Sequence, residues 1–497
     1  MMYRSEDKRY SRPEKGVGNV PDSGRLAIID IGSNSIRLVV YDRAGRYPFP
    51  LFNERITCQL GLDLDKTGIL QPENIKAALR ALRRFSPILR ALAPKILIAA
   101  ATAAARRAKN ADAFLEPAAE ILGQPVKVVS ASEEARLIAN GLISSWPRLT
   151  GLVADLGGGS LELVQVDEGE IINATSLNVG HLSSKNADEV ADMMSQIPWL
   201  PDLEGSKLYG IGGSFRAIGA AHISGTKYPV PLLHGLKIKR VPALALLNVI
   251  IKDGDLSAIP ADRRETIAMA AQIIKQLMKR SGVNAISISG TSLRDGLVAD
   301  LHQNRNTDQD PLNAVCSEIA ERSERYPGFN ESLSRFLQPL AAHFSEVMPE
   351  RLFIAACQLS DICWNEHPDM RGALAVEKVL ALPVFSLSHK ERAQLAKSIH
   401  HRYVGVKRYK DSIEPLNVLV GRKRGNAAKS IGLALRFAHM YSAGVGSLLD
   451  RISLSISDTN VNISMHLEAQ QMLDGHSQRR LKLLADSLDR DLIIQSK

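Results

Sequence analysis

Residues 30–42 read Asp-Ile-Gly-Ser-Asn-Ser-Ile-Arg-Leu-Val-Val-Tyr-Asp, and residues 155–167 read Asp-Leu-Gly-Gly-Gly-Ser-Leu-Glu-Leu-Val-Gln-Val-Asp. At an offset of 125 residues, Asp, Gly, Ser, Leu, Val and Asp recur in register. Each stretch follows one apolar run and leads into another, which predicts a strand, a tight Gly/Ser turn and a second strand. A repeat spaced by about one small domain predicts two similar lobes, with a cleft between the two turns.

The two turns have the composition of a phosphate site. Glycine lets the backbone approach a phosphate closely, and N–H and O–H groups can donate hydrogen bonds to its oxygens. The Asp that opens each turn cannot hold a phosphate directly, but it can hold a divalent cation or orient water. One such turn alone is more typical of an ordinary hairpin, whereas two in register favour phosphate binding. The predicted phosphate-binding residues are Gly32, Ser33, Asn34, Ser35, Gly157, Gly158, Gly159 and Ser160.

Two further Gly/Ser turns follow in the second half of this region. Residues 209–216 read Tyr-Gly-Ile-Gly-Gly-Ser-Phe-Arg and lead into a helix-like segment, which adds Gly213 and Ser214 to the predicted phosphate-binding residues. Residues 286–296 end a strand-like alternation, with Thr291 or Ser292 as a helix cap. Each turn is a weak signal alone, but a helix N-terminus behind a glycine turn is a natural anion site.

Composition limits the classes of protein to consider. A chain of 497 residues is too long for one hydrophobic core, and the net charge of +9 suits a polyanionic partner, although a merely basic protein stays open. Aromatic residues make up only 5%, so no nucleic-acid partner is expected, and no apolar run is long enough to cross a membrane. Four scattered cysteines and a polar stretch over residues 1–23, read as a disordered tail, favour a reduced, cytoplasmic protein.

The Asp-Ile-Gly-Ser-Asn-Ser turn resembles the first phosphate loop of the exopolyphosphatase and guanosine pentaphosphate phosphatase family, within the sugar kinase, Hsp70 and actin superfamily. The resemblance runs from about Gly24 to Asp300. It implies an α/β fold of two actin-like (ribonuclease H-like) lobes with an interlobe cleft, followed by an all-α HD-like domain. The expected boundaries are a tail over 1–23, lobe I over 24–136, lobe II over 137–303 and the helical domain over 304–497.

Further segments carry the resemblance and imply roles for particular side chains. In Thr-Ala-Ala-Ala-Arg-Arg-Ala-Lys-Asn, residues 102–110, Arg106 would reach the bound phosphates, although a solvated helix face is the alternative. In Ser-Ala-Ser-Glu-Glu-Ala-Arg-Leu, residues 130–137, Glu134 would be the catalytic base. The family commonly has Gly at position 131, and acids near a helix N-terminus are also common without catalysis. Asp155 and Glu162 would hold magnesium.

The region after residue 303 has helical periodicity and no Gly/Ser turns. Where an HD site would need a His-Asp pair, the chain has Ser360-Asp361, so we interpret this metal site as lost. Residues 399–429 are strongly basic, which suggests a track for a long phosphate chain; a solvated surface or a nucleic-acid patch are the alternatives. The predicted track residues are Arg402, Lys407, Arg408, Arg422, Lys423 and Arg424.

These observations lead to one main functional hypothesis and several alternatives. The main hypothesis is an exopolyphosphatase that processively releases orthophosphate from the end of inorganic polyphosphate. The nearest alternative is removal of the 5′ γ-phosphate from guanosine pentaphosphate. An actin-like ATPase or kinase and a non-enzymatic polyanion binder are less favoured, and no Gly-x-x-x-x-Gly-Lys-Ser/Thr loop is present. The resemblance also implies a homodimer.

Overall fold

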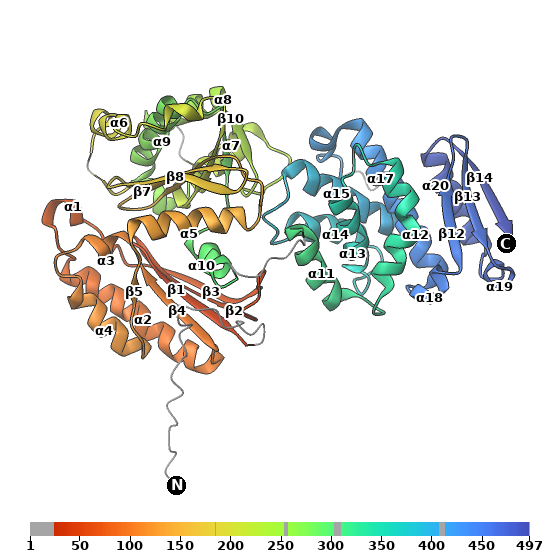
Figure 1. Ribbon diagram of the computed structural model, residues 1–497, viewed down its shortest axis with the longest axis horizontal. Helices are drawn as coiled ribbons and strands as arrows, with labels where there is room; N and C mark the ends of the chain where they lie inside the picture. Colours follow the sequence, from red (N-terminus) through yellow and green to blue (C-terminus); the bar gives the residue numbers. More distant parts are fainter. Residues whose placement is uncertain (1–23, 184, 253–256, 303–309, 407–412, 497) are drawn as a thin grey trace, which may run out of the picture. The chain divides into compact units, whose positions relative to one another are not determined.

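The structure, a computed structural model, describes residues 24–183, 185–252, 257–302, 310–406 and 413–496. The predicted N-terminal tail and the track residues Lys407 and Arg408 therefore lie outside the described residues. Residues 24–227 and 233–302 cluster into one compact unit, and residues 228–232 and 310–496 cluster into a second (Figure 1).

The first unit contains the two lobes that the repeat predicts. Lobe I (residues 24–130) is built on a five-stranded sheet of order β3-β2-β1-β4-β5. The first three strands pair antiparallel, and β4 and β5 continue the sheet in parallel. The strands of this sheet are β1 (Leu26–Ile31), β2 (Ser35–Tyr41), β3 (Pro50–Thr57), β4 (Ile96–Ala101) and β5 (Lys127–Val128).

Lobe II (residues 151–288) repeats this layout and adds an edge strand. Its six-stranded sheet has the order β10-β11-β9-β6-β7-β8, in which β6, β7 and β8 form an antiparallel meander and β9 and β11 continue in parallel. The strands are β6 (Gly151–Leu156), β7 (Leu161–Asp167), β8 (Glu170–Leu177), β9 (Lys207–Ile211), β10 (Lys237–Lys239) and β11 (Ala285–Ile288). The duplicated sheets confirm the predicted actin-like lobes.

Helices cover the sheets with apolar faces whose spacing the sequence sets. Along α2, Ala78, Leu82, Phe85 and Leu89 recur every three or four residues and are buried against the lobe I sheet, as one face of a helix requires. The helices of the first unit are α1 (Leu64–Thr67), α2 (Pro72–Leu92), α3 (Ala103–Arg107), α4 (Asp112–Leu122), α5 (Ala131–Ile143), α6 (Ala187–Ser195), α7 (Gly213–Thr226), α8 (Arg240–Ile251), α9 (Ile267–Ser281) and α10 (Leu293–Asp300).

Helices α5 and α10 form a layer that serves both lobes. They pack on one another, α5 also packs on β7 and β8, and α10 packs on β1, as Figure 1 shows between the two sheets. One buried cluster accordingly joins Ile28 of β1, Val153 of β6 and Leu137 of α5. Gly296 allows the close approach, because a Cβ there would lie 1.9 Å from the carbonyl oxygen of Leu137. The boundary expected between residues 136 and 137 falls inside α5.

The second unit is mainly helical, as predicted, but its end is not. Residues 452–496 include a three-stranded sheet of order β12-β13-β14, so the all-α expectation was wrong for this segment. Buried residues alternate with exposed ones along β12 and with half-buried ones along β13, which is the pattern of a sheet with one covered face. The strands are β12 (Ile452–Ile456), β13 (Asn460–Met465) and β14 (Asp491–Ser496).

Within the second unit, α15 packs against both α14 and α17. Among the described residues, no helix is long and apolar enough to cross a membrane. The helices are α11 (Pro311–Ser323), α12 (Phe329–His343), α13 (Glu350–Gln358), α14 (Arg371–Leu380), α15 (His389–Val404), α17 (Asn417–Ser442), α18 (Gly446–Leu449), α19 (Leu467–Gln470) and α20 (Gly475–Ser487).

Candidate active site

The two predicted turns have the same backbone construction. In the first hairpin the N–H of Gly32 donates to the carbonyl oxygen of Ser35 at 3.1 Å. In the second, the N–H of Gly157 donates to the carbonyl oxygen of Ser160 at 3.0 Å. Both bonds close the end of an antiparallel strand pair, β1–β2 and β6–β7 respectively. The strand, turn and strand that the repeat predicted are therefore present in both lobes.

In each turn, a neighbouring segment donates hydrogen bonds to the carbonyl oxygens, whereas several amide N–H groups of the turn have no acceptor among the described residues. The carbonyl of Ser33 accepts from the N–H of Gly61 at 2.8 Å, and the carbonyl of Gly158 accepts from the N–H of Leu182 at 2.9 Å. Within the described part of the chain, the amide N–H groups of four turn residues donate no hydrogen bond. These residues are Ser33, Asn34, Gly158 and Gly159. Unpaired N–H groups of adjacent turn residues form a concave anion site.

The two turns lie against one another, and the third turn lies beside the second. A Cβ on Gly158 would be 3.2 Å from the Cβ of Ser33, so the tips of the turns are in contact. Gly212 precedes the predicted residues Gly213 and Ser214 at the start of α7, and a Cβ on it would be 2.8 Å from Oδ1 of Asp155. Its φ of +98° also favours glycine. The structure thus brings these three predicted turns together. The fourth joins them, because the N–H of Ser289 donates to the carbonyl oxygen of Gly210 at 2.8 Å and Arg294 donates to Asp30 at 2.6 Å.

Glu134 occupies a buried position at the start of α5, and its neighbour Glu133 does not. Ser130 caps the helix by accepting from the N–H of Glu133. The Glu133 carboxylate pairs with Lys127, whereas the Glu134 carboxylate, only 7% exposed as a residue, accepts from Nη1 of Arg106 at 2.8 Å. Burial raises the pKa of Glu134 to about 7, although Arg106 opposes the shift. A carboxylate with a pKa near 7 suits a general base.

Arg106 was predicted to reach the bound phosphates, but in the structure one of its nitrogens binds protein groups. Its Nη1 donates both to Glu134 and to the carbonyl oxygen of Val129, each at 2.8 Å. It therefore orients the candidate base. Any contact of its other nitrogens with a phosphate stays a prediction.

The predicted metal ligands face one another across the second hairpin. Asp155 and Glu162 are direct partners in the β6–β7 ladder, so their side chains lie on the same face of the sheet. Burial raises the pKa of Asp155 to about 6, against the opposing effect of Arg216. Burial, reinforced by Glu134 and Asp155, raises the pKa of Glu162 well above its usual value. Burial and a neighbouring carboxylate both disfavour the ionised form, so a cation beside Asp155 and Glu162 would stabilise them in their charged form.

The site also contains arginines that the motifs did not assign. Arg37 lies opposite Arg55 across β2–β3, and Nε of Arg55 donates to Oγ of Ser35 at 3.0 Å. Burial lowers the pKa of Arg37 to about 10, with Arg294, Arg216 and Arg55 contributing. Arg294 in turn donates to Asp30 at 2.6 Å. Three of these arginines lie inside the motifs quoted above, so the sequence alone could have assigned them to the site: Arg37, Arg216 and Arg294. Arg55 lies in no such motif.

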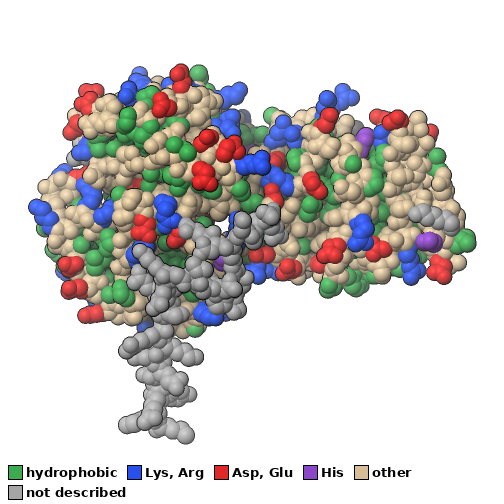
Figure 2. Space-filling view, in the orientation of Figure 1, with side chains coloured by type: hydrophobic (Ala, Val, Ile, Leu, Met, Phe, Trp, Pro, Cys, Tyr) green, Lys and Arg blue, Asp and Glu red, His purple; other side chains and the backbone are tan. Residues whose placement is uncertain are grey.

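In the second unit, two described residues of the predicted track bind other protein groups, and two are exposed to solvent. Arg402 is not on a surface track: its guanidinium donates to the buried carboxylate of Asp361 at 3.1 Å. Arg424 donates to the carbonyl oxygen of Val347 at 2.9 Å and to Gln394. Arg422 and Lys423 are exposed. On the face shown in Figure 2, basic side chains are interspersed with acidic ones over each unit.

Asp361 belongs to a compact polar network. It accepts from Nε of Arg325 at 3.0 Å as well as from Arg402, and Nε2 of His439 lies 2.8 Å from Oγ of Ser360. Burial, with Arg402 and Arg325, keeps the pKa of His439 well below its usual value, so the imidazole is neutral. Among the described residues, no group of three or more His, Cys, Asp or Glu is placed to hold a metal ion.

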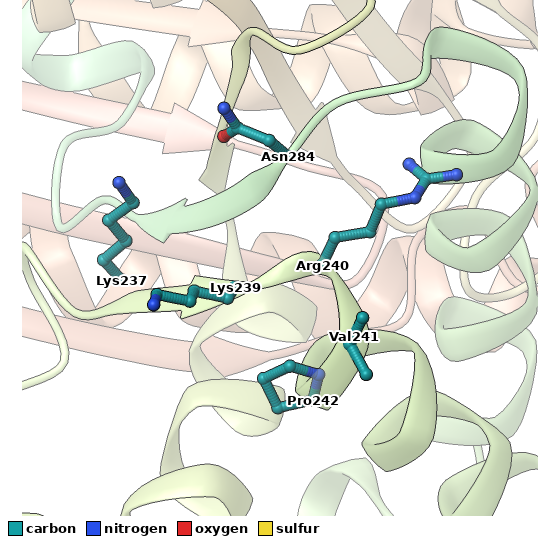
Figure 3. Close-up of a pocket in the computed structure, with 6 residues that line it drawn as sticks. All are labelled: Lys237, Lys239, Arg240, Val241, Pro242 and Asn284. Atoms are coloured by element: carbon teal, nitrogen blue, oxygen red, sulfur yellow. The ribbon is translucent and has the colours of Figure 1, made fainter.

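One pocket lies away from the turns. It measures about 390 Å³ and sits at the edge strand β10, separated from β6 by β11 and β9. Figure 3 shows the side chains of Lys237 and Asn284 on one side of it and those of Val241 and Pro242 on the other. The pocket lacks a candidate base, so we do not include it in the active site.

Comparison with known proteins agrees with this geometry. Residues 38–305, more than half of the chain, match the Ppx/GppA phosphatase family, and residues 335–492 match the family described as "Exopolyphosphatase, C-terminal". The chain belongs to the Ppx/GppA phosphatase family. The two matches cover most of the first unit and most of the second.

Individual relatives of this Ppx/GppA chain are distant. The chain is 24% identical over 75% of its length to a guanosine-5′-triphosphate,3′-diphosphate pyrophosphatase of Vibrio vulnificus, covering 74% of that protein. It is 26% identical over 55% of its length to the protein of that name from Vibrio campbellii, covering only 59% of it. A crystal structure of an exopolyphosphatase from Cytophaga hutchinsonii has the same fold, with a TM-score of 0.51, 22% identity, 56% of this chain covered and 99% of that one.

Proposed function

We propose that this chain is a magnesium-dependent exopolyphosphatase, which hydrolyses the terminal phosphoanhydride bond of inorganic polyphosphate. The observation that carries the proposal is the set of four unpaired N–H groups on two turns in contact, at Ser33, Asn34, Gly158 and Gly159. Phosphoryl transfer needs little covalent help from a protein beyond positioning and charge stabilisation, and amide donors supply both.

The chain's own side chains divide the remaining tasks. Glu134 accepts a proton from the attacking water, and Arg106 holds its carboxylate in place. Arg37, Arg55, Arg216 and Arg294 give the site the positive charge that a row of phosphates requires. The water oxygen bonds to the terminal phosphorus as the bridging oxygen leaves with the shortened chain, and one orthophosphate is released.

Magnesium fits the residues present. Asp155 and Glu162 offer paired carboxylate oxygens, and magnesium in phosphate-handling sites is commonly held by one or two carboxylates together with substrate oxygens and water. When bound, it would neutralise charge on the phosphates. Burial is the main cause of the raised pKa of both carboxylates, and a bound cation would oppose that shift.

Guanosine pentaphosphate is the second candidate substrate. The curated relatives named above are called guanosine-5′-triphosphate,3′-diphosphate pyrophosphatases, and both substrates end in a phosphoanhydride. We favour polyphosphate because the chain carries a net charge of +9 and exposes Arg422 and Lys423 on its second unit. Only a long polymer extends beyond its terminal phosphates far enough to use basic surface outside the turns.

The deciding experiment measures phosphate release from long polyphosphate, tripolyphosphate, guanosine pentaphosphate and ATP in parallel. We expect the highest kcat/KM on long polyphosphate, with Arg422→Glu and Lys423→Glu together raising KM for that substrate and sparing tripolyphosphate. Higher kcat/KM on guanosine pentaphosphate would replace polyphosphate by the second candidate. Phosphate release from none of the four would reject the proposal.

A further inference from the structure

Arg107 connects the two lobes at the point where the phosphate turns meet. It is the last residue of α3 in lobe I. Its Nη1 donates to the carbonyl oxygen of Gly159, at the tip of the lobe II turn, over 3.2 Å. Its Nη2 pairs with Asp65 of α1, also in lobe I. The adjacent Arg106 turns to Glu134, so the two neighbouring guanidinium groups do different work.

The contact beside Arg107 is tight. Ser33 is enclosed by three glycines: a Cβ would lie 2.8 Å from its Cβ if placed on Gly61, and 3.2 Å if placed on Gly158. A Cβ on Gly159 would lie 3.4 Å from its Oγ. The turns can approach this closely only because glycine occupies these positions.

We propose that Arg107, held by Asp65, is a positioning residue that keeps the second phosphate turn against the first. Arginine suits this task because its planar fork can serve two acceptors in fixed directions. The four unpaired N–H groups come from different lobes, so they converge on one phosphate only while the turns are in contact. This consequence for phosphate rests on the proposed function, whereas the contact itself does not.

Loss of Arg107 should raise KM and leave kcat nearly unchanged. Substrate binds the state with the turns in contact, and its apparent affinity falls in proportion to the fraction of protein in that state. Loss of Arg107 lowers this fraction, whereas saturating substrate restores it. Arg107→Ala should therefore raise KM for tripolyphosphate by roughly 5- to 30-fold, the range expected of one or two lost hydrogen bonds, and leave kcat within about twofold. Asp65→Asn should act in the same direction with a smaller effect.

A control variant separates this effect from general damage to lobe I. Arg84→Ala also removes a guanidinium–carboxylate pair, with Glu54, but on the exposed surface of α2. It should change neither KM nor kcat. Thermal unfolding of all three variants checks that the fold is retained.

A second measurement tests the contact without any activity. Ser33→Cys and Gly158→Cys place two thiols whose Cβ atoms lie 3.2 Å apart, slightly closer than the roughly 3.5–4.5 Å of a disulfide, so a small shift of the turns permits the bond. The four native cysteines are buried. Oxidation should cross-link this pair readily, and adding Arg107→Ala should slow cross-linking at least fivefold, whereas Arg84→Ala should not.

Unchanged cross-linking in the Arg107→Ala background would overturn the proposal. A fall of kcat by about a hundredfold at unchanged cross-linking would overturn it too, since Arg107 would then contact the reacting phosphate. Slower cross-linking in a chain that releases no phosphate from any substrate would instead support the contact and reject the proposed function.

Discussion

At equivalent positions of the two hairpins, Asp30 lies opposite Arg37 and Asp155 lies opposite Glu162. The backbones close with the same Gly-to-Ser hydrogen bond, yet the charges differ. The first carboxylate is compensated, because Arg294 donates to Asp30 at 2.6 Å. In the second hairpin two carboxylates share one face and have raised pKa values. Two hairpins with the same backbone construction can therefore differ in local charge through one pair of side chains, and only the second presents paired carboxylates.

The largest expected effect is at Glu134, which belongs to neither hairpin. If the hairpins position and neutralise the substrate, proton transfer falls to this residue alone. Glu134→Gln should lower kcat by about a hundred- to ten-thousandfold and leave polyphosphate binding nearly intact. Phosphate release and equilibrium binding are measured on the same preparation, with Glu133→Gln as control, since that carboxylate pairs with Lys127. More than about a tenth of wild-type kcat would remove Glu134 from the role.

The next effect tests the division of charge directly. Asp155→Asn should raise the magnesium concentration for half-maximal activity by about tenfold or more, because it removes one of the two proposed ligand carboxylates. Asp30→Asn, at the equivalent position, should leave that concentration within about twofold. Titration of phosphate release with magnesium gives both values. Equal shifts of the half-maximal magnesium concentration in the two variants would contradict the difference proposed between the hairpins. Activity that chelator does not reduce would contradict it as well.

A smaller effect should appear at the tips of the turns. Gly158 is the counterpart of Ser33, and only one of these positions has room for a side chain. Gly158→Ala should raise KM for tripolyphosphate about 3- to 10-fold, as a single unfavourable contact of about 1 kcal/mol would. Adding Ser33→Gly should recover part of the loss, because it removes the Cβ that the alanine meets. Gly225→Ala is the control: a Cβ there would meet nothing within 4 Å, and the residue lies near the end of α7, outside the turns. Additive effects would show that the two tips do not interact.

The smallest effect concerns stability against pH. The folded pKa of Glu162 lies above its usual value of 4.5, so the native chain holds this proton more tightly than the unfolded chain. The resulting stability is present below about pH 4.5 and is lost as pH rises through the folded pKa. In chelator at pH 8, Glu162→Gln should therefore raise the unfolding midpoint, on the order of 3 °C, with a smaller gain at pH 5.

Asp30→Asn should change the unfolding midpoint in the opposite direction. It breaks the pair with Arg294 and should lower the midpoint at both pH values. Calorimetric scans at pH 5 and pH 8 distinguish the two cases. A midpoint lowered by Glu162→Gln at pH 8 in chelator would contradict the charge assigned to the second hairpin.

The sequence predicted those features that local pattern determines. Both hairpins were predicted from their register. The cap before α10 was predicted as Thr291 or Ser292, and it is Ser292 in the structure. Arg107 was not assigned, because its partners Asp65 and Gly159 are distant in the chain and on different lobes. Arg402 was misplaced for the same reason, since a basic residue on a helix reads as exposed until its carboxylate is known.

The C-terminal strands were missed for another reason. Their alternation of apolar and polar residues was present, as in Ile-Ser-Leu-Ser-Ile over residues 452–456, but the strongly helical region before them set the interpretation of the whole segment. Short strands at the end of a helical region therefore need to be read with their own period.

The network around Asp361 has a consequence for how the second unit responds to its surroundings. The positive charge that compensates this carboxylate is carried by Arg325 and Arg402, which are covalent parts of the chain. A counter-charge of this kind cannot dissociate on dilution, compete with other metals or vary with supply. The folding of this unit should thus be independent of divalent ions, in contrast to the magnesium dependence proposed for the chemistry of the first unit.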